Sequence, residues 1–255
     1  MGKADLHTHT LYSWDGTCSV NAVLKQASHV MHLDVLAITD HDEIRGALEA
    51  EQLAPRYGIE VIPGSEISTA DGHLLALFVR EKFAAGLPLK ETILRVREQG
   101  GLCIIPHPEA KGAPSIKRAA IHAALRDAAV RETLLGIETF NAGLVYRSAN
   151  SRAAMLAEEL PLARMGSSDA HLLWMIGQGF TRFPGHTSSD LVAAIRSRNT
   201  IPDFSETIRP VVLVFRWVRG YLLRRAGWVQ YNRSPEEPVK LKRIPSLARM
   251  APANE

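Results

Sequence analysis

Short apolar runs rich in β-branched residues alternate with amphipathic helical stretches through the first 200 residues, and this alternation limits the folds open to the chain. Strands are expected at 3–6, 35–39, 60–63, 74–79, 102–106, 136–140 and 163–167. Helices are expected at 20–31, 43–57, 89–98, 115–131, 148–159 and 189–198, where apolar residues recur every three or four positions. Strand and helix in alternation indicate a parallel sheet with crossover helices, and about seven such units favour a closed or nearly closed α/β barrel.

Six of the ten histidines fall at or just beyond the ends of the expected strands. His7 and His9 follow the first strand, and on extended backbone both side chains point to the same side, so both can bind one ion. The other candidate ligands are Asp15, His41, Glu66, His73, His107, Asp169 and His171. The carboxyl ends of barrel strands share one rim, where barrel enzymes carry their chemistry, so these groups are expected to converge. His73 precedes its strand, which requires either an antiparallel strand or a loop that reaches in.

Imidazole and carboxylate ligands without thiolate suit Zn²⁺, Mn²⁺ or Fe²⁺. Nine candidates are too many for one tetrahedral ion and suit two or three divalent ions, with Glu66 as the bridging carboxylate. Such a cluster suits phosphate-ester hydrolysis, because one ion lowers the pKa of bound water to about neutral and paired ions clamp the attacking and leaving oxygens. Cys18 and Cys103 are the only cysteines and form no CxxC pair, so a disulfide scaffold or a thiolate zinc site is not expected.

Several other classes of protein lack support in the sequence. No GxGxxG or GxxxxGK[ST] motif follows a strand, which argues against dinucleotide and P-loop sites. The net charge of +3 is no strong signal for nucleic acid. No basic region followed by an apolar core opens the chain, so a cytoplasmic protein is expected.

The motifs DLHTHT, TDHD, GSEIS, GHLLALF, PHP and SSDAH occur in this order between residue 4 and about residue 202. Together they resemble the polymerase and histidinol phosphatase (PHP) superfamily, and most closely its short stand-alone phosphoesterases. The resemblance implies a distorted (β/α)7 barrel with a polynuclear site of two or three ions. One ion would be held by His7, His9, Glu66 and Asp169, a second by Asp15, His41 and His171, and a third by Glu66, His73 and His107.

Two acidic residues have particular implications within that resemblance. Asp15 stands where some members have histidine, which would weaken the second ion or favour a harder metal. Asp40 precedes the ligand of its motif, His41, and is expected to orient ligands rather than to bind an ion.

Phosphate recognition requires Arg or Lys near the rim, and three residues are candidates. Arg45 follows His41 and Lys111 follows His107 in sequence. Arg147 is the preferred candidate, because Asn141 and Asn150 on either side of it also resemble the family. His171 or His73 is the expected proton donor to the leaving oxygen.

The chain is expected to divide into a barrel at 1–204, a basic and aromatic helical extension at 205–233, and an extended or disordered tail at 234–255. Four arginines within 210–228 make that segment a poor transmembrane span. A helix packed on the barrel wall remains open beside a helix that contacts a membrane surface or a protein partner, which would make the protein peripheral at a membrane.

The sequence therefore predicts a metal-dependent phosphoesterase, a phosphatase or phosphodiesterase, that cleaves a small phosphorylated metabolite or nucleotide by attack of a metal-bound hydroxide. The alternative is a non-catalytic, metal-binding regulatory or scaffold module that docks through its C-terminal helix. A metal-dependent C–N hydrolase on a similar barrel is a third interpretation. The sequence does not indicate the oligomeric state.

Overall fold

The computed structural model describes residues 1–144, 148–205 and 210–226 of the 255-residue chain. One sheet contains the strands β1 (Gly2–Asp5), β2 (Val35–Ile38), β3 (Glu60–Thr69), β4 (Gly72–Leu77), β5 (Leu102–Ile105), β6 (Leu134–Asn141), β7 (Ala163–Ser167), β8 (Gly179–Phe183) and β9 (Ile201–Phe204). The helices are α1 (Val20–Lys25), α2 (Arg45–Leu53), α3 (Leu89–Glu98), α4 (Arg118–Ala124), α5 (Ala128–Thr133), α6 (Ser148–Ala157), α7 (Ser188–Arg196) and α8 (Pro210–Arg225). A π-helical turn (Gln26–Val30) and two 3₁₀ turns (Ala54–Arg56, Leu173–Met175) complete the elements.

The sheet curls into a nearly closed barrel with the strand order β7-β6-β5-β4-β3-β2-β1-β8-β9. Neighbours from β1 to β3 and from β5 to β7 are parallel, whereas β4, β8 and β9 pair with their neighbours antiparallel. Thr181 of β8, the strand next to the β9 edge, is bonded to β7 at the other edge of the sheet: its Oγ1 donates to the Gly166 carbonyl at 2.9 Å and accepts from the Gly166 amide at 3.0 Å. A Cβ at Gly166 would collide with the Phe180 carbonyl, so glycine permits this approach. The expected distorted α/β barrel is confirmed.

The structure differs from the expected elements in three main places. Strand β3 continues to Thr69 instead of ending at residue 63, so Glu66 lies within it. Strands β8 and β9 were not predicted; in β9, Pro202 interrupts the apolar pattern. The single helix expected at 115–131 is divided into α4 and α5. Asp127 begins α5 by accepting hydrogen bonds from the amides of Ala129 and Val130, which interrupts one continuous helix.

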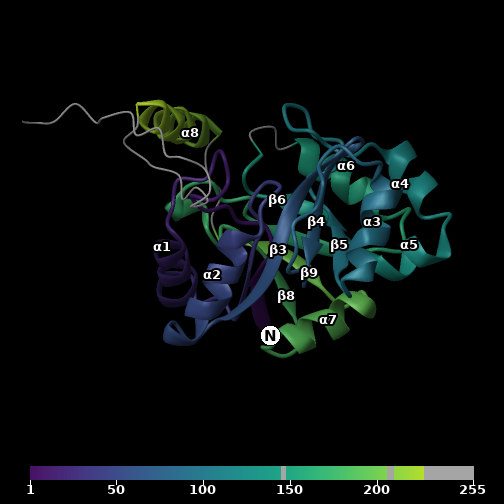
Figure 1. The fold of residues 1–255 in the computed structure, drawn as a ribbon, viewed down its shortest axis with the longest axis horizontal. Coiled ribbons are helices and arrows are strands. Elements are labelled where there is room, and N and C mark those ends of the chain that lie inside the picture. Colours follow the sequence, from purple (N-terminus) through teal and green to yellow (C-terminus); the bar gives the residue numbers. More distant parts are fainter. Residues whose placement is uncertain (145–147, 206–209, 227–255) are drawn as a thin grey trace, which may run out of the picture.

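The two faces of the strands pack into different apolar clusters. Val35 and Ala37 belong to the cluster inside the barrel, whereas Leu36 and Ile38 of the same strand belong to the cluster beneath the surrounding helices. Helix α7 contributes Leu191 to the inner cluster and contacts β3, β6 and β8, so it covers one end of the barrel. Figure 1 shows α7 beside the N-terminus, at the end of the molecule opposite α8.

Helix α8 lies within the segment expected as a C-terminal extension. Gly220 is buried, and a Cβ there would lie 2.9 Å from Leu172 Cδ2 and 3.7 Å from Thr17 Cγ2. The helix therefore contacts the rim of the barrel that follows β1 and β7 (Figure 1). No helix in the described part of the chain is both long and apolar enough to span a membrane. The tail expected at 234–255 lies outside the described residues.

Candidate metal centre

All nine candidate ligands come together at the rim that the sequence pattern indicated. They form four overlapping groups, each with potential ligand atoms within 4.8 Å of one another. The groups are His9, Asp15, His41 and His171; His7, His9 and Glu66; His7, His107 and Asp169; and His41, Glu66 and His73. The separate strand ends therefore build one continuous cluster.

Glu66 lies at the centre of the cluster, on β3, with its side chain almost fully buried. Its Oε2 faces the ring nitrogens of His7, His9 and His41 at 3.1, 3.3 and 3.2 Å. Its Oε1 faces His73 at 2.8 Å and His107 at 3.1 Å. A carboxylate with imidazoles on both oxygens has the arrangement that a bridge between ions requires.

The strand that carries His73 runs antiparallel, which decides between the two arrangements left open by the sequence. In the β3–β4 hairpin, Ser68 pairs with His73, and Glu66 pairs with Leu75. His73 therefore lies at the start of β4 near the same rim as the ends of the parallel strands. Its Nδ1 reaches Glu66 from the neighbouring strand.

A second part of the cluster is built around Asp15. Its Oδ2 lies 2.9 Å from His171 Nε2 and 3.3 Å from His41 Nε2. Ser13 Oγ donates to the other carboxylate oxygen at 2.7 Å, which holds the loop in place. The rings of His9 and His171 stack with centroids 4.2 Å apart, so this group joins the cluster around Glu66.

The polar atoms in the centre fit divalent ions. Three buried ring nitrogens, His9 Nε2, His41 Nδ1 and His73 Nδ1, lie within 3.3 Å of a Glu66 oxygen but make no hydrogen bond of normal geometry to any described residue. Buried imidazole nitrogens normally find a partner, and these three point towards carboxylates, as ligands of a shared ion would. The donor set of imidazole and carboxylate suits Zn²⁺, Mn²⁺ or Fe²⁺.

The electrostatics keep the central carboxyl groups ionised. Burial acts to raise the pKa of Glu66, but the charges of His7, His41 and His73 outweigh it and hold that pKa well below its usual range. The same opposition of burial and histidine charge, with His7 as the main partner, holds the pKa of Asp169 well below its usual range. Both groups are therefore anionic at neutral pH, the state in which a carboxylate binds a metal.

Two of the candidate ligands adopt left-handed backbone conformations. The φ angle is 30° at His107 and 51° at Asp169. Residues other than glycine pay about 1–3 kcal/mol for such sparsely populated conformations, which concentrate at functional sites. Each residue lies two positions after the end of a strand, β5 for His107 and β7 for Asp169. The unusual φ turns the side chain out of the strand direction and into the cluster.

Glu138 on β6 is a site residue that the sequence reasoning missed. It is buried, and its Oε1 accepts from His7 Nδ1 at 2.8 Å. Its Oε2 accepts from the His107 amide at 2.8 Å and from Asn141 Nδ2 at 2.9 Å. The hydrogen bond to His7 Nδ1 leaves Nε2 as the free ligand atom. The only signal for Glu138 in the sequence was a carboxylate within an expected strand that is otherwise mostly apolar.

Two further buried carboxylates hold the loops that carry ligands. Asp40 accepts from the Thr10 amide at 2.6 Å and from Thr10 Oγ1 at 2.7 Å, which agrees with the expectation that it orients rather than binds. Asp5 accepts from the amides of Ser168 at 3.0 Å and Gly177 at 2.8 Å. Burial raises the pKa of Asp5 to about 6 against these hydrogen bonds.

The basic residues proposed for phosphate have different surroundings. Arg45 pairs with Glu43 at 2.5 Å, whereas Lys111 lines the pocket above the cluster. Arg147 lies outside the described residues. Asn141 and Asn150 on either side of it bond to each other, since the Asn141 amide donates to Asn150 Oδ1 and Asn150 Nδ2 donates to the Asn141 carbonyl, both at 3.1 Å.

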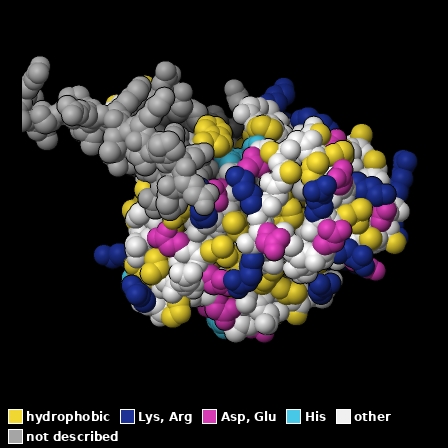
Figure 2. All heavy atoms as spheres, viewed as in Figure 1, with side chains coloured by type: hydrophobic (Ala, Val, Ile, Leu, Met, Phe, Trp, Pro, Cys, Tyr) yellow, Lys and Arg dark blue, Asp and Glu magenta, His cyan; other side chains and the backbone are white. Residues whose placement is uncertain are grey.

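The cluster forms the floor of a pocket of about 460 Å³. Its apolar lining includes Trp14, Leu144 and Met175 from the barrel and Val214 and Val218 from α8. Figure 2 shows histidine side-chain atoms (cyan) in a recess beside hydrophobic side chains (yellow). The C-terminal helix thus contributes to the site instead of lying on a distant wall of the barrel.

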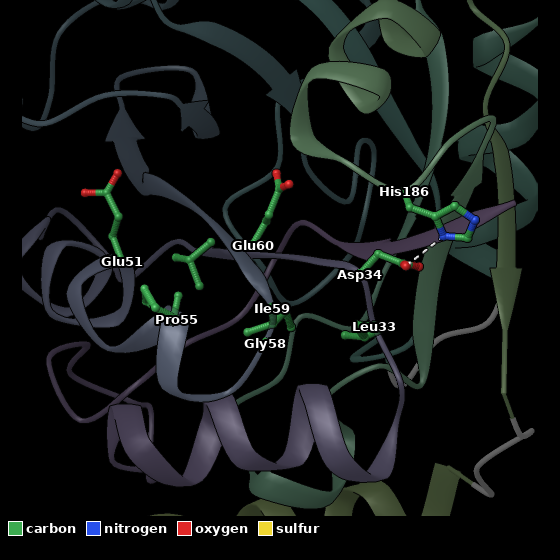
Figure 3. Close-up of a pocket in the computed structure, with 10 residues that line it drawn as sticks. Leu33, Asp34, Glu51, Pro55, Gly58, Ile59, Glu60 and His186 are labelled. Carbon is green, nitrogen blue, oxygen red and sulfur yellow. Dashed lines mark hydrogen bonds and ion pairs between the residues drawn. The ribbon is translucent and has the colours of Figure 1, made fainter.

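A second hollow lies near the opposite end of the barrel, and Figure 3 shows its lining. Its acidic residues have structural partners: Asp34 bonds to His186 Nδ1 at 2.8 Å, and Glu60 accepts from the Ser188 amide at 2.7 Å. Glu51 pairs with Arg80. These carboxylates are therefore engaged in holding loops together.

The fold and the site define an α/β barrel with clusters of imidazole and carboxylate groups suited to divalent metal ions. Two family models match this chain. The model described as PHP domain matches residues 5–139, and the model described as PHP-associated matches residues 147–200. The chain belongs to the PHP family.

Three relatives support the assignment. An uncharacterized protein of Methanocaldococcus jannaschii, MJ1587, is 41% identical over 150 residues, 55% of this chain and 82% of the relative. A second protein of that organism, MJ0417, is 31% identical over 183 residues, 71% of this chain and 70% of the relative. The phosphoribosyl 1,2-cyclic phosphate 1,2-diphosphodiesterase of Eggerthella lenta is 35% identical over 104 residues, 38% of this chain and 39% of the relative.

Solved structures agree with the fold. PsfC from Pseudomonas syringae has a TM-score of 0.62 and 21% identity, covering 89% of this chain and 99% of that protein. A protein assigned as a metal-dependent phosphoesterase from Bifidobacterium adolescentis has a TM-score of 0.57 and 19% identity, covering 76% and 96%. At identities of 21% and 19%, these similarities show that the fold is shared and nothing further.

Proposed function

We propose that the protein is a metal-dependent hydrolase that cleaves a phosphate ester of a small molecule. The observation that carries the proposal is the convergence of nine imidazole and carboxylate groups in one cluster centred on Glu66, in which three buried imidazole nitrogens face Glu66 but make no hydrogen bond of normal geometry to any described residue. The phosphodiesterase of Eggerthella lenta and the assigned phosphoesterase of Bifidobacterium adolescentis support the same reaction class.

Two or three divalent ions would occupy the cluster. The proposed ligand sets are His7, His9, Glu66 and Asp169 for one ion, Asp15, His41 and His171 for a second, and Glu66, His73 and His107 for a third, in keeping with the distances between their side chains. When bound, the ions would lower the pKa of water and neutralise the charge of the phosphate.

The side chains prepare the site by their hydrogen bonds. His7 Nδ1 donates to Glu138, and His171 Nδ1 donates to the Asp169 carbonyl at 2.9 Å, so both rings present Nε2 to the cluster. We assign proton donation to the leaving oxygen to whichever of His171 and His73 does not bind an ion, because a metal-bound imidazole nitrogen carries no proton; both line the pocket. Arg147 remains the proposed phosphate-binding residue.

The test is hydrolysis of 4-nitrophenyl phosphate and bis(4-nitrophenyl) phosphate by the purified protein with added Mn²⁺. His9→Ala should lower kcat/KM by about 100-fold or more, because His9 belongs to two of the ligand groups. His122→Ala is the matched control, since this exposed histidine lies on α4 outside the cluster. The preferred ester would distinguish phosphatase from phosphodiesterase.

Bound metal without turnover of either ester would favour the non-catalytic regulatory or scaffold module. Turnover of an amide and not of an ester would favour the C–N hydrolase. A cytoplasmic location remains a prediction. So does contact of residues 210–228 with a membrane surface or a protein; residues 227 and 228 lie outside the described part of the chain.

A further inference from the structure

The pocket above the metal centre combines two opposite kinds of surface. Its floor consists of ligand residues such as His41, Glu66 and His73. Val214 and Val218 of α8 form part of its wall and are about 40% exposed, 41% and 42% respectively. These valines are four positions apart, so they lie on one side of the helix about one turn from each other. The wall can contact a ligand that reaches up from the floor.

Contact at Gly220 holds α8 above the ligand rim. Gly220 packs against Leu172, which directly follows the ligand His171. A larger residue would push the helix away, because even a Cβ would lie only 2.9 Å from Leu172 Cδ2. The helix that carries the apolar wall thus packs on the residue next to a candidate metal ligand.

The chemistry of this wall restricts what can lie against it. Valine side chains offer no hydrogen bond, so the hydroxyl groups of a sugar placed there would lose water without replacement. Met175 and Leu144 continue the apolar surface inside the pocket. Lys111 is the one Lys or Arg among the described residues that line it. A ligand that complements this pocket places an anionic group on the floor and an apolar group against the wall.

We propose that α8 is a specificity element that selects phosphate esters of apolar alcohols, with an alkyl or aryl group packed on Val214 and Val218. This inference rests on the proposed function. In the reaction, water adds its oxygen to phosphorus, the ester P–O bond breaks, and the alcohol oxygen leaves with a proton. The products are inorganic phosphate and alcohol from a monoester, or a monoester and alcohol from a diester.

The experiment measures kcat/KM along a series of n-alkyl groups. Methyl, butyl and hexyl phosphate form the monoester series, and methyl diesters with the same alkyl groups form the diester series, with Mn²⁺ present. The alkyl groups differ little in electronic effect, so length changes mainly the apolar contact. The native protein should gain about fourfold per methylene group that becomes buried on the wall.

Two double variants separate the wall from the rest of α8. Val214→Ser with Val218→Ser should flatten the dependence on chain length. Phe215→Ser with Leu222→Ser is the matched control: both residues are exposed on α8 and neither lines the pocket, so the dependence should persist. Val218→Phe should shift the preference to a shorter chain, a change that misfolding cannot produce.

The outcomes distinguish this inference from the function beneath it. Turnover of methyl esters that His9→Ala abolishes, with no dependence on chain length in the native protein, would overturn the specificity proposal and leave the phosphoesterase intact. Equal flattening by both double variants would also overturn it. Absence of turnover for every ester would overturn the proposed function and this inference with it.

Discussion

Replacing Glu138 with glutamine tests whether the buried carboxylate positions the metal ligands. The side chain is 1% exposed and accepts hydrogen bonds from His7, His107, Asn141 and Ser167. Glutamine keeps the shape but turns one acceptor oxygen into an NH₂ group. Facing the His107 amide, that NH₂ leaves two donors unpaired. Facing His7, it requires the other tautomer of the ring, which protonates Nε2 and removes the ligand atom.

Either orientation has a measurable effect. Hydrogen bonds to a buried charge contribute about 1.5–3 kcal/mol each, so Glu138→Gln should lower the free energy of unfolding by about 3 kcal/mol. The affinity for Mn²⁺ should fall by about 10–100-fold, as for other residues that orient metal ligands. Urea unfolding in the presence of a chelator measures the first quantity, and titration with Mn²⁺ measures the second.

Glu132→Gln is the control for loss of one carboxylate charge. Glu132 pairs with Arg97 at 2.9 Å on the surface, with 66% of its side chain exposed. Its replacement should change stability by less than about 0.5 kcal/mol and leave metal affinity unaltered. If Glu138→Gln matches this control in both measurements, the carboxylate does not position His7, and the reasoning from its hydrogen bonds is refuted.

Three further predictions concern the metal ions and the barrel seam, the contact of β7 with β8 at Gly166 that closes the barrel. Removing metal with a chelator should lower Tm by about 5–10 °C in a thermal melt, because ions that bind only the folded state stabilise it; an unchanged Tm would argue against binding at this cluster. Asp15→His should raise the bound Zn²⁺ to Mn²⁺ ratio after equilibration with both ions, measured by mass spectrometry of the metals; an unchanged ratio would remove Asp15 from the ligand set. Gly166→Ala should cost about 1–3 kcal/mol in urea unfolding, since its Cβ would meet the Phe180 carbonyl, and an unaltered midpoint would contradict the described seam.

Much of the barrel could be predicted from the sequence, because long periodic segments carry a strong signal. The helix expected at 89–98 and the strand expected at 163–167 coincide with α3 and β7. The same signal was absent from β9, where Pro202 interrupts a four-residue edge strand whose residues are partly exposed. A strand of this kind is stabilised by its pairing with β8 rather than by its own pattern.

The candidate ligands could be predicted because their residue types and places at strand ends carry chemical meaning without coordinates. Glu138 could not, since its function depends on a histidine 131 positions away in the chain. The position of α8 over the pocket could not be predicted from the sequence either. A basic and aromatic helix indicates a contact, but only the packing of Gly220 on Leu172 reveals which surface it contacts.

The distance along the chain between the groups of the cluster has a consequence for biosynthesis. Asp15 and His171 lie 2.9 Å apart in space and 156 residues apart in sequence. A ribosome adds about 5–20 residues per second, so about eight to thirty seconds separate the synthesis of these two groups. During that interval the nascent chain already exposes His7, His9 and His41, which can bind stray cations without the geometry of the finished centre. The complete set of candidate ligands is thus available only after β7 and the residues that follow it have been synthesised and the barrel has closed.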